Sequence, residues 1–147
     1  MYGAYLTMAS PYINKNLDKN SDLFAKQHAR KTNTPDLLSI LKLEIGNSGN
    51  KVPTLKFLSQ LLQISPATLK RKLKEYNLTY IELKNMIRFE KAQVLLSTSD
   101  KKLASISLEL GFNDTSNFIK SFKLWSGTTP GRYRQLNQEL KSKHSRC

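Results

Sequence analysis

The chain has 147 residues, of which 39% are hydrophobic and 9% aromatic, and this is enough to bury the core of one domain or of two very small ones. Gly and Pro number only 6 and 5, which excludes collagen-like and low-complexity sequences, and no apolar run approaches the roughly 18 residues of a membrane-spanning helix. Lys and Arg number 24 against 11 Asp and Glu, and the net charge of +13 predicts a polyanionic partner, most often nucleic acid, with an anionic membrane surface as the alternative.

Residues 1–35 show no sustained helical or strand periodicity, and we expect them to form an irregular basic tail. The first residues lack the basic and apolar segments of a secretory signal. The single cysteine, Cys147, is the last residue, which excludes an internal disulfide and is typical of a protein of the reducing cytoplasm. We therefore expect a cytoplasmic protein.

From residue 36 to about residue 140, helical patterns follow one another with short breaks between them. Apolar residues recur at helical spacing in seven segments, and no segment alternates convincingly with the period of a strand. Thr79 and Glu82 form a capping box that opens a long helix over about 79–97. The sequence thus predicts an all-α fold of about seven helices over 36–140, followed by a basic C-terminal tail at 141–147.

The long helix carries apolar residues on two sides. Leu83 and Ile87 mark one stripe, and Met86, Phe89 and Leu96 mark another. A helix that is apolar on two sides is expected to lie between two packing partners.

Two segments of the domain, residues 58–65 and 106–113, repeat one pattern of residue types. Each has an aliphatic residue, a small residue, a second aliphatic residue, a turn position, an apolar residue and a capping residue. This pattern is typical of a helix-turn-helix motif, although a single copy also fits an unrelated helical bundle. We therefore expect two such motifs, at about 54–76 and about 102–125, joined by the long helix.

Two positions of the repeat have a clear physical purpose. The small residue, Ser59 or Ser107, lets the two helices of a motif cross closely. The turn position often needs a positive φ, which Gly111 adopts at no steric cost, whereas Gln63 has to adopt it with a side chain. We expect the first turn to be the less regular one.

The C-terminal part of this pattern resembles the signature of AraC/XylS-type transcription regulators. Over residues 106–134 the chain reads I-S-x3-G-F-x-D-x-S-x-F-x3-F-K-x3-G-x-T-P-x2-Y-R, and the likeness extends to about 36–137. The family often has Ala where Ser107 stands and Gly where Gln63 stands. The resemblance implies a regulator that binds double-stranded DNA with two recognition helices in successive major grooves. By the habit of the family, we expect an activator, with RNA polymerase as a candidate partner.

Length is the larger departure from that family. Many members carry a separate effector-binding or dimerisation domain, and residues 1–35 are too few to form one. Either the chain is a stand-alone DNA-binding member or it is a fragment, and no effector follows from the resemblance. Two recognition helices on one chain would let a monomer bind an asymmetric site.

The predicted first recognition helix, Pro66–Tyr76, turns its leucines inward and its basic residues outward. Arg71 is the strongest candidate contact, because its guanidinium matches either guanine or a phosphate; the alternative is a basic face that only meets solvent. The predicted DNA contacts of this helix are Ala67, Lys70, Arg71 and Lys74.

The resemblance places Thr115, Ser116 and Lys120 at reading positions of the second recognition helix, Asp114–Trp125. The hydroxyls of Thr115 and Ser116 discriminate weakly between bases, so we expect phosphate binding and shape readout here; the alternative is that these two residues cap the helix or only meet solvent. Arg132, with the helix start at 129–131, is assigned to phosphate because a helix N-terminus attracts anions.

Two further arginines have open roles. Arg134 can bind phosphate or pair with a carboxylate inside the domain, and a structural ion pair is the expected role of Arg88. The aromatic residues of the second motif are expected to form core rather than to stack on bases.

Other kinds of function find little support in the sequence. His28 and His144 lie in no cluster with spaced acidic residues or cysteines, and there is no phosphate-binding glycine loop, so we expect no enzyme, no metal and no cofactor. A membrane-surface protein is disfavoured because the apolar stripes are needed for the bundle. The remaining alternative is an AraC-like domain that acts through protein contacts without specific DNA binding.

Overall fold

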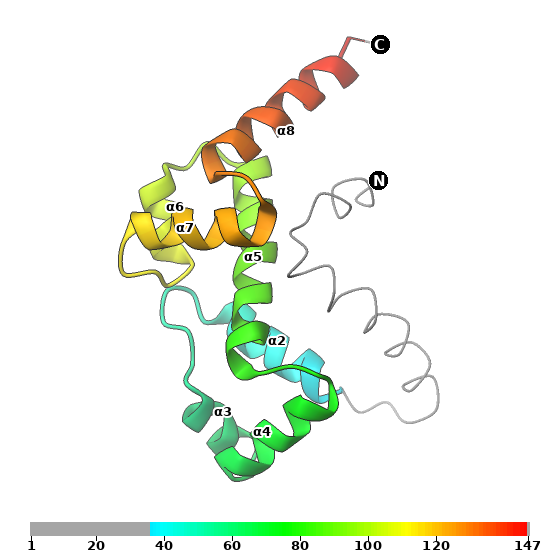
Figure 1. Ribbon diagram of the computed structural model, residues 1–147, viewed down its shortest axis with the longest axis vertical. Helices are drawn as coiled ribbons and strands as arrows, with labels where there is room; N and C mark the ends of the chain where they lie inside the picture. The colour runs from blue at the N-terminus through cyan, green and yellow to red at the C-terminus, as the bar shows by residue number, and fades with distance from the viewer. Residues whose placement is uncertain (1–35, 147) are drawn as a thin grey trace.

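Seven helices and no strand make up residues 36–146, the part of the chain that the computed structural model describes (Figure 1). The predicted all-α class is confirmed, and the tail predicted at 1–35 lies outside the described residues. None of the described helices is both long enough and apolar enough to cross a membrane. In chain order the helices are α2 (Leu37–Asn47), α3 (Leu55–Leu61), α4 (Pro66–Glu75), α5 (Tyr80–Thr98), α6 (Leu103–Glu109), α7 (Thr115–Ser126) and α8 (Pro130–His144).

The C-terminal end differs from the prediction. The segment 141–147 was expected to be a tail, but α8 continues through its first residues to His144. Lys141 explains part of this, because its ammonium donates a hydrogen bond to the carbonyl of Ser97 at the end of α5. The three basic residues in the last turn of α8 also oppose the negative end of its helix dipole.

Hydroxyl and carboxylate caps set where most of these helices begin. Thr54 accepts a hydrogen bond from the Phe57 N–H, Ser65 from the Thr68 N–H, and Asp114 from the Asn117 N–H. Each cap satisfies a backbone donor that the helix itself leaves unpaired. The predicted capping box is also present, since Thr79 and Glu82 exchange side-chain-to-backbone hydrogen bonds.

Two separate hydrophobic cores form on opposite sides of α5. Leu83 and Ile87 belong to the first core, with residues of α2, α3 and α4. Phe89, Ala92 and Leu96 belong to the second, with residues of α6 and α7. The two packing partners predicted for this helix are therefore present, although Met86 packs against the first core and not with Phe89.

The turns of the two helix-turn-helix motifs have matching backbone conformations. Gln63 has φ +54° and Gly111 has φ +75°, so both turn positions adopt the left-handed region as predicted. The following N–H groups, of Ile64 and Phe112, each donate to the carbonyl of the buried serine five residues earlier, at 3.0 Å. The two motifs are thus repeats in structure as well as in sequence.

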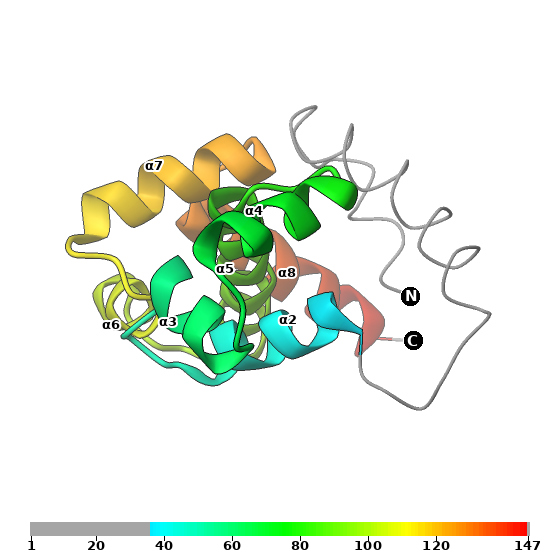
Figure 2. The same ribbon diagram turned by 90° about the horizontal axis from the view of Figure 1, so that it is seen from below.

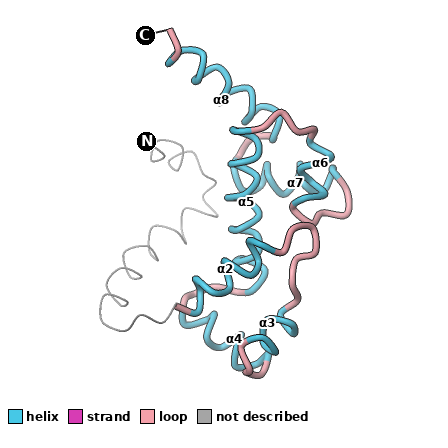
Figure 3. The backbone as a smooth tube through the Cα atoms, turned by 180° about the vertical axis from the view of Figure 1, so that it is seen from behind, coloured by secondary structure: helices cyan, strands magenta, loops and turns pink. Residues whose placement is uncertain are grey.

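The turn of the second motif also touches the first subdomain, by which we mean α2 to α4 together with the loop between α2 and α3. A Cβ built at Gly111 would lie 2.9 Å from the Asn50 carbonyl oxygen and 3.0 Å from Cγ2 of Val52. Both belong to the loop between α2 and α3, which rises towards the α6–α7 turn in Figure 3. Gly111 therefore permits both the turn and this close approach.

We predict that Gly111→Ala destabilises the chain by about 2 kcal/mol, because it adds a backbone clash to the cost of a positive φ. Gly49→Ala is the matched control, since Gly49 also has a positive φ (+61°) but open space around its Cβ position. Urea unfolding of both variants measures the difference. Equal losses in the two variants would show that the contact with Asn50 does not matter.

Candidate nucleic-acid interface

The outer face of α4 gathers the predicted contact residues of the first motif. Leu69 and Leu73 are fully buried and fix the inner face of this helix. Residues three and four apart share a helix face, so Leu69 and Leu73 define the inner face and several of the neighbouring positions point outward. The side chains on that outer face are all exposed: Ala67, Lys70, Arg71 and Lys74.

The C-terminal end of α4 is tied to the start of α2. The phenol of Tyr76, the residue after α4, donates a hydrogen bond to Oδ1 of Asp36 at 2.8 Å. Asp36 precedes α2 but makes no side-chain cap to it. Burial and then the carboxylate of Asp36 raise the pKa of Tyr76 to about 12. The position of α4 thus depends on α2 as well as on its own leucines.

The second motif presents α7, which buries its aromatic side. Phe118, Phe122 and Trp125 are buried, and the Phe118 and Phe122 ring centroids lie 6.0 Å apart in an edge-to-face arrangement. The expectation that these rings form core is therefore confirmed. On the other side Ser116 and Lys120 are exposed.

The tip of α7 is less open than the sequence predicted. Thr115 is only half-exposed. Asn117 points its amide back at the capping residue, with its Nδ2 2.6 Å from Oδ2 of Asp114. A carboxylate at this end also repels phosphate, so α7 presents a weaker anion-binding surface than α4.

The two candidate recognition helices lie on the same side of α5 (Figure 2). Each begins at the turn of its own motif, and α5 joins the two motifs. The helices α4 and α7 therefore form one candidate surface on this side of α5.

The start of α8 lies close in sequence to this surface. Thr129 caps α8 by accepting the Arg132 N–H at 3.3 Å, and Pro130 has no N–H. The helix N-terminus predicted to hold phosphate thus has fewer available donors than expected. The Arg132 side chain is exposed and donates a hydrogen bond to the side-chain amide oxygen Oε1 of Gln135 at 3.1 Å.

The two arginines with open roles both bind backbone carbonyls. Arg88 donates to the backbone carbonyls of Leu110 (2.9 Å) and Gly111 (2.8 Å). The predicted structural ion pair is therefore wrong, because the acceptors are carbonyl oxygens and not a carboxylate. Burial lowers the pKa of Arg88, yet an arginine stays charged at neutral pH. Arg134 donates to the Lys101 carbonyl at 2.6 Å, so its partner is neither a phosphate nor a carboxylate, the two that the sequence suggests.

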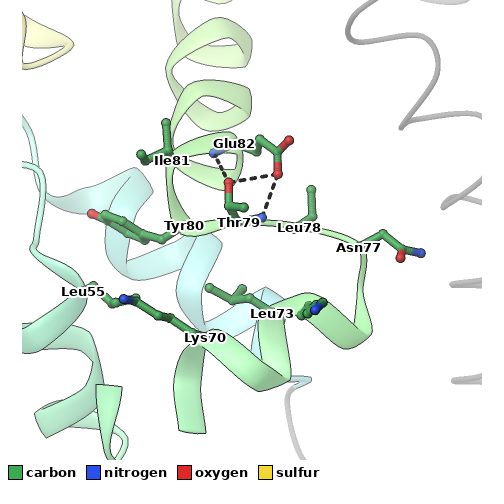
Figure 4. Close-up of a pocket in the computed structure, with 10 residues that line it drawn as sticks. Leu55, Lys70, Leu73, Asn77, Leu78, Thr79, Tyr80, Ile81 and Glu82 are labelled. Carbon is green, nitrogen blue, oxygen red and sulfur yellow. Dashed lines mark hydrogen bonds between the residues drawn. The ribbon is translucent and has the colours of Figure 1, made fainter. Parts of the chain in front are cut away.

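An apolar pocket of about 640 Å³ lies beside the C-terminal half of α4 (Figure 4). Leu73, Leu78 and Ile81 line it together with Lys70 and Lys74. The capping-box hydrogen bonds of Thr79 and Glu82 lie at its wall. The sequence did not indicate this pocket, because it arises where α3, α4 and α5 meet. Across residues 36–146, no three His, Cys, Asp or Glu side chains gather to hold a metal ion.

Comparison with known proteins agrees with this geometry of paired helix-turn-helix motifs. A family described as a helix-turn-helix domain matches residues 58–136. The transcriptional activator PerA of Escherichia coli O127:H6 is 33% identical over 97 residues, covering 66% of this chain and 34% of PerA. The ornithine utilization regulator of Pseudomonas aeruginosa is 33% identical over 99 residues, covering 67% of this chain and 29% of that protein. The chain spans about a third of the length of these relatives.

Solved structures show the same fold. A DNA-binding transcriptional dual regulator from Escherichia coli K-12 has a TM-score of 0.68 at 24% identity, covering 75% of this chain and 99% of that one. The DNA-binding domain of AdpA, solved with a target DNA, has a TM-score of 0.65 at 19% identity, covering 74% of this chain and 98% of that one. The chain belongs to the AraC-type helix-turn-helix family of transcription regulators. The prediction that it is not an enzyme is confirmed by this membership.

We predict that raising the pH from 10 towards 12 destabilises the wild-type chain more than a Tyr76→Phe variant. The Tyr76 phenol has a raised pKa in the folded chain, so its stabilising contribution is complete below pH 10 and is lost as the pH rises through about 12. Chemical unfolding at a series of pH values measures this. Parallel pH profiles for the two proteins would contradict it.

Proposed function

We propose that this chain is a sequence-specific regulator that binds double-stranded DNA with α4 and α7 in successive major grooves. The observation that carries the proposal is the position of two capped helices, with outward polar or basic faces, on one side of α5. Successive major grooves on one side of a duplex repeat at about 34 Å, the spacing that paired helix-turn-helix units use.

The two helices would contribute unequally. The outer face of α4 carries Lys70, Arg71 and Lys74, which can reach both phosphates and guanine edges. The predicted contacts of α7 are Thr115, Ser116 and Lys120, and Asp114 stands at its tip. We therefore assign most of the affinity and base reading to α4, and phosphate and shape readout to α7 and to Arg132.

The wider role follows from the family. We propose that the protein acts in the cytoplasm, that it activates transcription through RNA polymerase, and that one copy of the chain suffices to bind an asymmetric site. The likeness to PerA, which is named a transcriptional activator, supports activation. Selection of bound duplexes from a random library by the 147-residue chain tests specific binding directly, and the absence of any enriched site would favour a regulator that acts only through protein contacts.

We predict that Arg71→Ala weakens binding to a selected site by about 1–3 kcal/mol, because it removes a guanidinium that would contact guanine or phosphate. Lys42→Ala is the control, since it removes one exposed charge from α2, away from the proposed surface. Gel-shift titrations at fixed salt measure both variants. An unchanged affinity of Arg71→Ala on every selected site would remove Arg71 from the interface.

We also predict a steep salt dependence of the DNA affinity. With about six phosphate contacts, the slope of log K against log salt is expected near −5, because each contact releases condensed counterions. Arg132→Ala should make the slope less negative by about one, if Arg132 binds a phosphate. A nearly flat slope for the wild-type chain would exclude DNA as the main partner.

A further inference from the structure

The angle between the two helix-turn-helix motifs depends on very few elements. Within residues 36–146 the two hydrophobic cores have no residue in common, and α5 is the only described helix that contributes buried residues to both. Within each half the helices pack on each other, α3 on α4 and α6 on α7. What fixes one recognition helix relative to the other is therefore α5 and whatever braces the second motif against it.

Arg88 occupies the point of α5 at which the core changes. It follows Ile87, which is buried in the first core, and precedes Phe89, which is buried in the second. Its guanidinium reaches the end of α6 and bonds two carbonyls there, at 2.9 Å and 2.8 Å. A helix C-terminus leaves carbonyls without intrahelical partners and carries partial negative charge, so a cation is well suited to this position.

The same side chain is connected to the second recognition helix through one aromatic ring. The guanidinium carbon lies 4.5 Å from the centroid of the Phe112 ring, which is a cation–π distance. Phe112 in turn packs against Phe118 at 5.6 Å and Trp125 at 6.2 Å, both of them on α7. A displacement of Arg88 would thus move Phe112, and Phe112 would displace the rings of α7 that it contacts.

The first subdomain holds the other side of this turn. The Asn50 carbonyl oxygen and the Val52 side chain occupy the space that a Cβ at Gly111 would need, and Val52 also packs against the first core. The Tyr80 hydroxyl of α5 donates to the Pro53 carbonyl and anchors this loop. The α6–α7 turn is therefore clamped between Arg88 and the loop that joins α2 to α3.

We propose that Arg88 is a positioning residue that sets the separation of α4 and α7, and so selects the half-site spacing that the chain accepts in DNA. The geometric part of this inference is independent of DNA, whereas the part on spacing rests on the proposed function. Lysine cannot replace it, because one ammonium lacks the planar fork that reaches both carbonyls and covers the ring.

The first test measures the separation of the two helices without DNA. Spin labels are attached to Lys72→Cys on α4 and Lys123→Cys on α7, both exposed positions, in a Cys147→Ser background of the full chain. We expect Arg88→Lys to widen the label-to-label distance distribution about twofold, because a clamp on the turn is lost, and Arg146→Lys to leave it unchanged. A distribution in Arg88→Lys that matches the parent would overturn the proposal.

A second variant covers the case in which Arg88→Lys does not fold by circular dichroism. Val52→Ala trims the opposite side of the clamp and leaves Arg88 in place. It is expected to widen the same distribution, and an unchanged width in a folded Val52→Ala protein would contradict a clamp on this turn.

The DNA test separates positioning from general damage. On a selected bipartite site, Arg88→Lys is expected to lose about tenfold in affinity, with single half-sites bound as by wild type. Across duplexes whose half-sites are moved apart or together by single base pairs, the variant should discriminate less than wild type. An equal loss on half-sites and intact sites, or an unchanged spacing profile, would count against Arg88. Failure of the wild-type chain to select any site would refute the proposed function, while the spin-label distances still decide the geometric claim.

Discussion

The structure of residues 36–146 depends on one requirement, which is that α5 be buried on opposite sides. Leu83 and Ile87 face one way, and Phe89, Ala92 and Leu96 face nearly the other way, as expected at 100° of rotation per residue. A helix of this kind is not stable alone, because each side exposes apolar surface. Each side therefore requires its own cluster of short helices, and the two clusters become two similar helix-turn-helix units on one axis.

Much of this fold could be predicted because its signals are local. The buried serines at 59 and 107, the positive φ at Gln63 and the Thr79–Glu82 capping box all depend on residues only a few positions apart. The errors concern choices made in three dimensions. Met86 joined the first core, α8 continued to His144, and Arg88 bound carbonyls where a carboxylate was expected. In each case the residue could pair with several partners, and the packing of another helix against it selects one of them.

The candidate interface divides in the same way. Which residues of α4 face outward follows from the inward leucines, so Lys70 and Arg71 could be placed from periodicity alone. The sequence does not show how many of the candidate DNA-contacting groups are already engaged in helix caps. Asp114 engages the amide of Asn117, and Thr129 engages the N–H of Arg132. The same hydroxyl or carboxylate can cap a helix or meet a ligand, and the sequence does not distinguish the two.

The recognition helix α4 carries more positive charge than α7. This difference makes the junction between the two motifs important for the proposed binding. Under the proposed function, the basic helix α4 would bind DNA first, and the linkage between the motifs would then set the effective concentration at which α7 meets DNA. With a loose linkage, the weak hydroxyl contacts expected from α7 would add little, because much of their free energy would be spent on orienting it. With α7 held through Phe112, Arg88 and α5, those contacts would contribute without that cost. A rigid junction would thus allow a weakly charged recognition helix to add both affinity and a preferred spacing.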